Sequence, residues 1–388
     1  MQLPDYHGGG IVNLMASLQA GLGSRTGQTE PAYPVCPLLP PERVRTAEQV
    51  LLLVIDGLGL NYLRAHPEAA CLSDHLRGGL TSVFPPTTAS AVTSFLTGDA
   101  PQQHGLTGWH MWFAELGSVL AVLPGRARYG GVDLQSAGID AGRLFRHTPF
   151  ADRLAVETHS LAPRHIADSD FNLTHLGRAR LHRFDSLTDL LGQAANLLDD
   201  GNPKFVYAYW PELDSLGHRH GIWSRAAREH LLELDHGFEL LLSRRGSNTL
   251  VVVCADHGQI DVGDAQRIEL DRHPRLAETL ALPLCGEARA VYCYLRPGYE
   301  RQFDDCLRDE LGDMATAHHS RDLIDHGWFG LGTPHPELHR RVGDRVLLMK
   351  EHYLLKDWLA QEPRHRLIGV HGGLDPDELW VPLIVAET

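Results

Sequence analysis

The stretch that decides the fold is Lys204–Trp210, KFVYAYW, taken together with Asn248–Ala255, NTLVVVCA, and the residues between them. Both are short, continuous apolar runs, which is typical of strands covered on both faces in a parallel sheet. Between them Ser224 can cap a helix on which apolar residues recur at helical spacing: Ala227, Leu231, Leu234, Phe238 and Leu241. This succession of strand, helix and strand predicts an α/β fold.

Three further segments share the strand pattern: Gln49–Ile55, Val291–Leu295 and Trp380–Val385. We expect a three-layer α/β/α sandwich with a mostly parallel central sheet, because helices must cover both faces of such strands. No linker forces a domain boundary, so residues 1–388 are predicted to form a single domain. Two irregular stretches rich in Arg, His and Pro, about 126–183 and 262–363, are predicted to be insertions that cap the core.

Composition narrows the classes of partner. The 388 residues include 35 Lys plus Arg and 49 Asp plus Glu, a formal charge of −14. This balance argues against a nucleic-acid polymer or an anionic membrane as the main partner, because binding to phosphates depends on Lys and Arg. Six scattered cysteines and the lack of any long apolar run predict a cytoplasmic protein. The 24 histidines hint at metal or acid-base chemistry without locating it.

Aspartates lie where three of the predicted strands end. Asp56 follows Gln49–Ile55, Asp256 follows Asn248–Ala255, and Asp214 comes four residues after Trp210. Ligands of open α/β sheets bind beyond the carboxyl ends of the strands. A lone Asp at such a place is more often a turn former, but three of them, two with histidine partners, favour a site.

Three short motifs supply those histidines: Asp214-Ser-Leu-Gly-His218, Asp256-His257-Gly258, and Gly369-Val-His371-Gly372-Gly373. In the first, a tight turn allowed by Gly217 would let both side chains reach one ion. Each motif alone has a simpler interpretation as a solvated pair, a turn or a surface residue. Together their carboxylates and imidazoles are typical of Zn²⁺ or another first-row divalent ion, and are too rich in nitrogen for Ca²⁺.

A nucleophile is predicted at Thr88. A short strand is expected over Thr81–Phe84, two prolines follow, and apolar residues then recur at helical spacing, so Thr88 should stand at a helix N-terminus. Its hydroxyl and the free N–H groups of the first turn would face an anion there. For an isolated Thr, a simple N-cap at Thr87 or Thr88 would be preferred. Beside a metal site a nucleophile is favoured, because a divalent cation can turn an alcohol into an alkoxide.

The order of these elements resembles the alkaline phosphatase superfamily and, within it, the type I phosphodiesterase/nucleotide pyrophosphatase family. The resemblance covers about residues 50–385. It implies an alkaline-phosphatase-like fold and two divalent ions, with zinc the first expectation and manganese the second. One ion would be held by Asp56, Asp256, His257 and the Thr88 oxygen. The other would be held by Asp214, His218 and His371.

The resemblance also implies a reaction, in which Thr88 attacks phosphorus in line and water then hydrolyses the phospho-threonyl intermediate. The expected function is hydrolysis of phosphodiester or pyrophosphate bonds. Three carboxylates (−3) and two divalent ions (+4) leave a local charge of +1, so the site would attract an anion. The expected partner is a small phosphorylated substrate, and the oligomeric state stays open.

Trp109 departs from the family pattern, which usually has an Asn at this place to hold a phosphoryl oxygen. Its indole offers an N–H donor and a stacking face, so Trp109 is predicted to bind substrate, with a core aromatic as the alternative. From Gly78 to Gly125 there is no Lys or Arg, which favours diesters, because a dianionic monoester commonly needs an Arg fork. The alternative functions are a phosphonoacetate hydrolase or phosphomonoesterase on the same scaffold, and a degenerate protein that binds metal or nucleotide.

Overall fold

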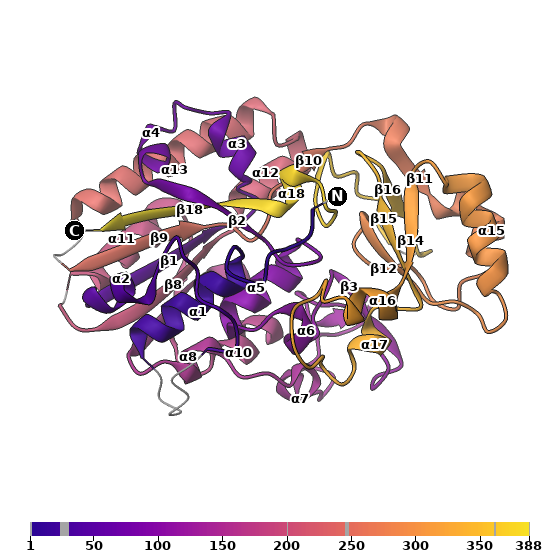
Figure 1. Ribbon diagram of the computed structural model, residues 1–388, viewed down its shortest axis with the longest axis horizontal. Coiled ribbons are helices and arrows are strands. Elements are labelled where there is room, and N and C mark those ends of the chain that lie inside the picture. The colour runs from indigo at the N-terminus through magenta and orange to yellow at the C-terminus, as the bar shows by residue number, and fades with distance from the viewer. Residues whose placement is uncertain (1, 24–30, 200, 245–247, 361, 388) are drawn as a thin grey trace.

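The computed structural model describes residues 2–23, 31–199, 201–244, 248–360 and 362–387, and builds them around two seven-stranded sheets (Figure 1). The central sheet has the strand order β2-β18-β9-β1-β8-β6-β7. Strands β9, β1, β8, β6 and β7 are parallel, whereas β18 runs antiparallel to both β9 and β2. Their bounds are β1 (Gln49–Ile55), β2 (Leu76–Thr81), β6 (Glu157–Pro163), β7 (Arg180–Phe184), β8 (Lys204–Trp210), β9 (Thr249–Cys254) and β18 (Trp380–Glu387).

Helices cover both faces of this sheet, so the predicted three-layer α/β/α arrangement is confirmed (Figure 1). One layer contains α1 (Ile11–Leu22), α2 (Pro41–Thr46), α5 (Thr88–Thr97), α8 (Phe150–Arg153) and α10 (Asp170–Leu176). The other contains α3 (Leu60–Arg64), α4 (Ala70–Asp74), α11 (Leu187–Leu197), α12 (Glu212–His220) and α13 (Arg225–Arg244). None of the described helices is both long and apolar enough to cross a membrane.

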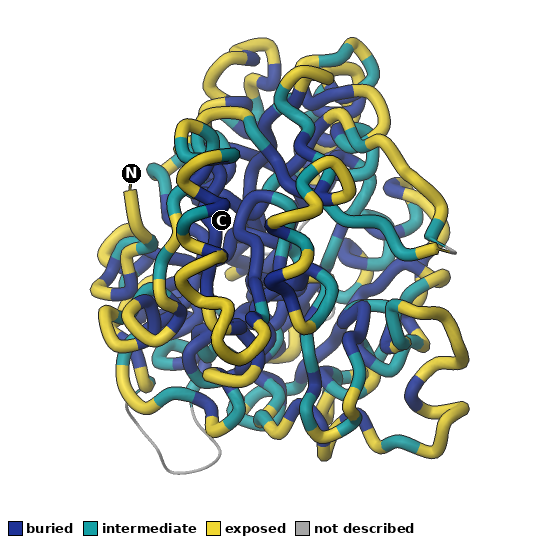
Figure 2. The backbone as a smooth tube through the Cα atoms, turned by 90° about the vertical axis from the view of Figure 1, so that its right-hand side faces the viewer, coloured by how far each residue is buried: buried dark blue, intermediate teal, exposed yellow. Residues whose placement is uncertain are grey.

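The strands between these layers form the hydrophobic core. Every residue of β1 and β9 is buried, which explains their continuous apolar sequences, and Figure 2 shows the buried strands running through the middle of the molecule. The helix predicted between β8 and β9 is α13. Ser224 caps its start, because its hydroxyl accepts a hydrogen bond from the Ala227 amide at 3.2 Å.

The second sheet has the order β14-β15-β13-β12-β3-β4-β5, and we call it, with its helices, the cap. Its strands are β3 (His110–Phe113), β4 (Ser118–Ala121), β5 (Arg126–Ala127), β12 (Cys285–Gly286), β13 (Ala290–Cys293), β14 (Ala315–His319) and β15 (Arg345–Met349). Its helices are α15 (Glu300–Leu311), α16 (Ser320–Asp325) and α17 (Leu338–Arg341). Strands β3, β4 and β5 come from the first half of the chain, and β12, β13, β14 and β15 come from the second. The two sets meet where β12 pairs with β3, at the single register pair of Gly286 with His110.

Short elements join the two sheets. The antiparallel pair β10 (Ile260–Asp261) and β17 (Gly369–Val370) lies beside the central sheet, and the parallel pair β11 (Arg267–Glu269) and β16 (Leu354–Lys356) lies beside the cap. The remaining short helices are α6 (Pro101–His104), α7 (Ala141–Phe145), α9 (Arg164–Ala167), α14 (Pro274–Ala277), α18 (Pro376–Leu379), η1 (Asp264–Gln266) and η2 (Leu270–Arg272).

The structure corrects three predicted boundaries. The expected insertion at 126–183 is wrong in its second half, because β6 and β7 are strands of the central sheet, and the cap begins earlier, at β3. The strand expected over Thr81–Phe84 is instead β2, which ends at Thr81. In the second predicted insertion, 262–363, no strand of the described residues joins the central sheet. That the whole chain is a single domain stays a prediction.

Candidate active site

Three adjacent parallel strands bring acidic residues to one edge of the central sheet. Strands β9, β1 and β8 are neighbours, and Asp256, Asp56 and Asp214 follow their carboxyl ends. All three side chains are buried. Gly57 lets two of them come close, because its φ is +76° and a Cβ at this position would stand 3.0 Å from the Cα of Asp214.

Asp214 and His218 lie on one face of α12, four residues apart, with Asp214 Oδ2 and His218 Nε2 separated by 3.2 Å. The predicted tight turn at Gly217 is therefore wrong, because the segment is helical. Gly217 is needed for space instead: a Cβ here would stand 1.8 Å from the side-chain oxygen of Gln259. Gln259 uses this space to donate hydrogen bonds from Nε2 to the backbone and side-chain oxygens of Asp214.

The β10–β17 pair brings two distant histidine motifs together. It holds the segment after His257 against the segment before His371, and their imidazole rings stack with centroids 3.8 Å apart. His218 joins them, because its Nδ1 donates to the Gly369 carbonyl at 2.8 Å. This hydrogen bond places a proton on Nδ1, so Nε2, which faces Asp214, is the nitrogen that can act as a ligand once it is deprotonated.

Thr88 is the first residue of α5, and its Oγ1 lies 3.2 Å from His257 Nε2. Thr87 occupies the N-cap position, but its hydroxyl makes no capping hydrogen bond. It donates instead to Oε1 of Glu287, in the cap, at 2.7 Å. The N-cap alternative for Thr87 or Thr88 therefore does not describe how these hydroxyls are used.

All seven residues proposed as metal ligands gather at this edge of the sheet. Ligand atoms of Asp214, His218 and His371 lie within 4.8 Å of one another, as do those of Asp56, Asp214 and His257. Asp256 belongs beside the second group, because its Oδ2 lies 3.4 Å from His257 Nε2. Asp214 thus borders both groups, which the sequence did not indicate. The assignment of these residues as metal ligands is a proposal that the geometry supports.

The electrostatics of the site fit cations. Burial, reinforced by the Asp256 and Asp214 carboxylates, raises the pKa of Asp56 well above its usual range, and burial also raises the pKa of Asp256. One oxygen of each, Asp56 Oδ1 and Asp256 Oδ2, is buried without a hydrogen-bond partner. Buried carboxylates require a counter-charge, and two orphaned oxygens in a carboxylate cluster are what divalent ions would satisfy.

The pKa shifts of Asp214 and His218 favour the charged forms of both groups, unlike the pKa shifts of Asp56 and Asp256. Burial alone would lower the pKa of His218, but the Asp214 carboxylate raises it to about 9. Burial likewise opposes ionisation of Asp214, yet the charge of His218 holds the pKa of Asp214 below its usual range. Without a cation the pair is therefore charged. Binding of an ion would displace the Nε2 proton of His218 to solvent, and this nitrogen and the Asp214 carboxylate would then hold the ion.

A family model described as type I phosphodiesterase/nucleotide pyrophosphatase matches residues 50–374. The chain belongs to this family. It is therefore a member of the alkaline phosphatase superfamily and a phosphoric ester hydrolase. The family depends on divalent metal ions, and the chain has candidate groups of metal-binding residues. No curated protein sequence matches the chain.

Solved structures share the fold of this phosphodiesterase-family protein at low sequence identity. Murine ectonucleotide pyrophosphatase/phosphodiesterase 5 is 17% identical with a TM-score of 0.66, over 87% of this chain and 88% of that chain. An inactive threonine-to-alanine variant of it, in complex with AMP, has a TM-score of 0.63 at 17% identity, over 86% and 87%. Phosphonoacetate hydrolase from Sinorhizobium meliloti, in complex with phosphonoformate, is 18% identical with a TM-score of 0.64, over 87% and 89%.

Sequence reasoning missed three residues that support the site of this family member. The Tyr209 hydroxyl donates to Asp56 Oδ2, and Gln259 holds Asp214 as described above. Glu287 Oε1 accepts from the Thr87 hydroxyl and from the Trp109 amide, each at 2.7 Å. Tyr209 could have been noticed as a polar side chain near the end of a buried strand. Gln259 and Glu287 carry no local signal, because their partners are distant in the sequence.

A cleft of about 1030 Å³ opens from the site and is lined by both sheets. Thr88, His218 and His371 line it from the central sheet, and Trp109 and Glu287 line it from the cap. The Trp109 side chain is 40% exposed, so the alternative of a core aromatic does not hold. Its place in the cleft supports the proposed contact with substrate.

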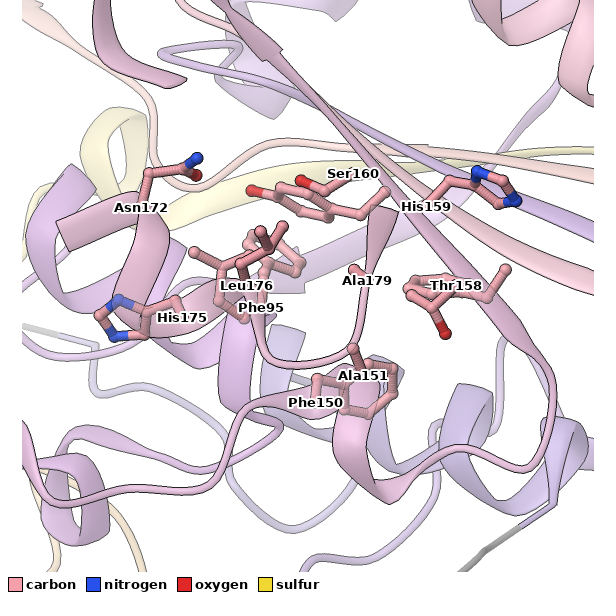
Figure 3. A pocket seen from close by; sticks show the side chains of 13 residues that line it. Phe95, Phe150, Ala151, Thr158, His159, Ser160, Asn172, His175, Leu176 and Ala179 are labelled. Carbon is pink, nitrogen blue, oxygen red and sulfur yellow. The ribbon is translucent and has the colours of Figure 1, made fainter. Parts of the chain in front are cut away.

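A second cavity is far smaller, about 20 Å³, and shares no lining residue with the cleft. Figure 3 shows it among side chains of α5, α8, α10 and β6, including Phe95, Phe150, Ser160 and His175. Its volume corresponds to about one water molecule. It cannot hold a phosphorylated substrate, whereas the cleft has room for one beside the candidate ligands.

Proposed function

We propose that this protein hydrolyses phosphodiester or pyrophosphate bonds in small molecules, with Thr88 as the nucleophile. The observation that carries the proposal is the position of Thr88. Its Oγ1 stands at the N-terminus of α5, 3.2 Å from His257 Nε2, and faces the cleft. A hydroxyl there lies among candidate ligands and at the positive end of the helix dipole.

The residues divide between two divalent ions. Asp56, Asp256, His257 and Thr88 would hold one ion, and Asp214, His218 and His371 would hold the other. Such ions supply electrostatic stabilisation for the Thr88 alkoxide and for the charge that develops on the leaving oxygen. Mixed carboxylate and imidazole ligands favour Zn²⁺, with Mn²⁺ as the second choice.

The covalent intermediate forms on the Thr88 oxygen. Its hydroxyl proton leaves to solvent, the bond from Oγ1 to phosphorus forms, and the bond from phosphorus to the leaving oxygen breaks, after which that oxygen takes a proton from water. Water then attacks phosphorus and releases the Thr88 hydroxyl. The inactive threonine-to-alanine variant of the murine neighbour supports a threonine in this role.

The expected substrates are small and phosphorylated. The neighbours were solved with AMP and with phosphonoformate. A diester is favoured over a monoester because residues 78–125, around the nucleophile, contain no Lys or Arg to neutralise a dianion. In the cleft, the guanidinium of Arg128 is already bound to Asp357 and Glu362.

The experiment compares four substrates, each with and without metal. Purified protein is assayed on an aryl phosphodiester, a dinucleoside pyrophosphate, an aryl phosphomonoester and phosphonoacetate, after chelation and after return of Zn²⁺ or Mn²⁺. We expect the first two to be preferred, chelation to abolish turnover, and metal to restore it. Thr88→Ala should lose activity yet retain metal, as measured by elemental analysis, while Thr88→Ser should retain part of the activity.

Each alternative has its own result. Full activity of Thr88→Ala would exclude the covalent mechanism. A preference for the monoester or for phosphonoacetate would replace the substrate class, and stoichiometric metal with no turnover on any of the four would indicate a binding protein.

A further inference from the structure

The cleft contains an ammonium group without an ion-pair partner. Lys356 is the last residue of β16 and lines the cleft together with His218, His371 and Trp109. Among the described residues, no carboxylate lies within 4.0 Å of its Nζ and none accepts a hydrogen bond from it. Its recorded contact is with the ring of Trp358, whose centroid lies 5.5 Å from Nζ.

The carboxylates that line the cleft near Lys356 have other partners. Glu362 receives two hydrogen bonds from Arg128, each at 2.8 Å. Asp357 accepts from Arg128 at 2.8 Å and from the Leu284 amide at 2.9 Å. Glu287 Oε1 is occupied by the Thr87 hydroxyl and the Trp109 amide. Lys356 therefore lines a cleft in which Asp357, Glu362 and one oxygen of Glu287 already have partners.

An ammonium in this position is unfavourable until an anion reaches it. Burial lowers the pKa of Lys356, and the charge of Glu287 opposes that shift without reaching ion-pair distance. Removing an ammonium from water is unfavourable unless a charged or polar partner replaces the water. The cleft shared with the catalytic residues is the side from which such a partner can arrive.

Lys356 lies on the side of the second ligand group. On β16, Leu354 packs in one hydrophobic cluster with Val370 of β17, which directly precedes His371. Lys356, at the end of β16, lines the cleft together with His218 and His371. The Thr88 oxygen belongs to the other ligand group, so the ion that Asp214, His218 and His371 would hold is the one that would stabilise the charge on the leaving oxygen. An anion on Lys356 would therefore belong to the part of the substrate beyond the scissile bond.

We propose that Lys356 binds an oxyanion carried by the leaving group of the substrate, either a carboxylate or a further phosphoryl group. The proposal rests on the proposed function and names a feature of its substrate. Trp358 supports the ammonium from beside it through the contact with its ring, and so limits where Nζ can point.

The test uses three substrates that differ in one substituent. Each is a methyl aryl phosphodiester whose aryl leaving group carries a carboxylate, a phosphonate as a stable substitute for a phosphoryl group, or a neutral carboxamide. The variants are Lys356→Met and, as a matched control, Lys350→Met. Lys350 is a cap lysine outside the cleft, and its Nζ donates to the Gly312 carbonyl at 2.8 Å.

We expect the wild-type protein to prefer the two anionic substrates. Lys356→Met should reduce kcat/KM on them by about tenfold to a hundredfold, the usual range for a charge-assisted contact, and change the carboxamide by less than about twofold. Lys350→Met should alter none of the three. The larger loss, on the carboxylate or on the phosphonate, identifies the natural anion. Equal losses on all three substrates, or no wild-type preference, would overturn the proposal.

A binding measurement separates this proposal from the proposed function. Calorimetry on the metal-loaded Thr88→Ala protein, with and without Lys356→Met, requires no turnover. Tighter binding of the anionic compounds that disappears with Lys356→Met would uphold the subsite even if none of the diesters were hydrolysed. Equal affinities in both proteins would refute the subsite even if hydrolysis occurs.

Discussion

The imidazole rings of His257 and His371 stack with their centroids 3.8 Å apart and their planes inclined by 19°. Each ring belongs to a different group of candidate ligands. The β10–β17 pair holds them in this arrangement, because Ile260 pairs with Val370 and Asp261 pairs with Gly369. The two ligand groups are therefore in contact through these rings, so a substitution of one histidine should affect the geometry of both groups.

His371→Asn should remove one ion and most of the activity. Asn is close in size to His but cannot replace the imidazole, so we expect metal content to fall from two ions to one per chain and turnover to fall by about a hundredfold or more. Elemental analysis and an aryl phosphodiester assay measure the two effects. His365→Asn is the control, because His365 lines the same cleft outside the ligand groups. Two retained ions in His371→Asn would contradict the assignment.

Tyr209→Phe should lower activity while Tyr207→Phe should not. Both tyrosines lie on β8 and are largely buried, but only the Tyr209 hydroxyl donates to Asp56, whereas the Tyr207 hydroxyl has no partner among the described residues. Loss of a hydrogen bond to a metal ligand typically reduces metal affinity or activity by about 10-fold to 100-fold. Metal titration of the two variants measures this. Equal behaviour of the pair would remove Tyr209 from the support of the site.

The continuous apolar strands were readily predicted from the sequence. The predicted bounds of β1 and β8 match the structure residue for residue, because a strand covered on both faces leaves an uninterrupted apolar run. Strands β6 and β7 escaped notice because β7 is an edge strand and both carry histidines, including His159 and His182. The strands of the cap are short, so they also show no such run.

The sequence indicates the candidate site residues that follow a strand end or belong to a short motif. It does not indicate the residues that only tertiary packing brings to the site. The strand ends indicated the acidic residues, since parallel strands share one carboxyl edge. The sequence predicts a turn at Gly217, because a glycine gives no sign of which neighbour needs the space, and in the structure Gln259 needs it. Glu287 and Lys356 come from segments whose place beside Thr88 follows only from the packing of the cap.

Acid should destabilise the protein through a group of histidines apart from the site. Burial lowers the pKa values of four of them, to about 4 for His175 and His335 and further for His104 and His147, where repulsion from neighbouring histidines adds to the shift. The unfolded chain, with pKa values near 6.5, binds protons first as pH falls. Stability is therefore full above about pH 6.5 and is lost as pH falls through about 4, by about 1.4 kcal/mol per pH unit for each group.

Thermal unfolding of the metal-loaded protein between pH 7 and pH 4 measures this loss. His147→Phe should flatten the dependence, because neither ring nitrogen of His147 has a hydrogen-bond partner among the described residues and its ring stacks on His175. His165→Gln, at an exposed position, should leave the dependence unchanged. An identical pH profile for His147→Phe and the wild-type protein would rule out a contribution from His147.

Arg289→Met should destabilise the junction of the cap with the central sheet. Arg289, just before β13, forms a fully buried ion pair at 2.8 Å with Glu378 of α18. Removing the guanidinium leaves a buried carboxylate without its counter-charge, which should lower the free energy of unfolding by about 3–5 kcal/mol. Denaturant unfolding tests this. Arg289→Met with Glu378→Leu should recover much of the loss, and a double variant as unstable as the single one would refute the explanation.

The single register pair between Gly286 and His110 has a consequence for how the family can diversify. The cap is a composite of two chain segments, and the central sheet that carries the candidate ligands is encoded largely outside them. Selection can thus reshape the surface that meets the leaving group while the catalytic edge is inherited unchanged. A hybrid that exchanges caps between relatives must graft both segments together, because either half alone would lose its partner strand.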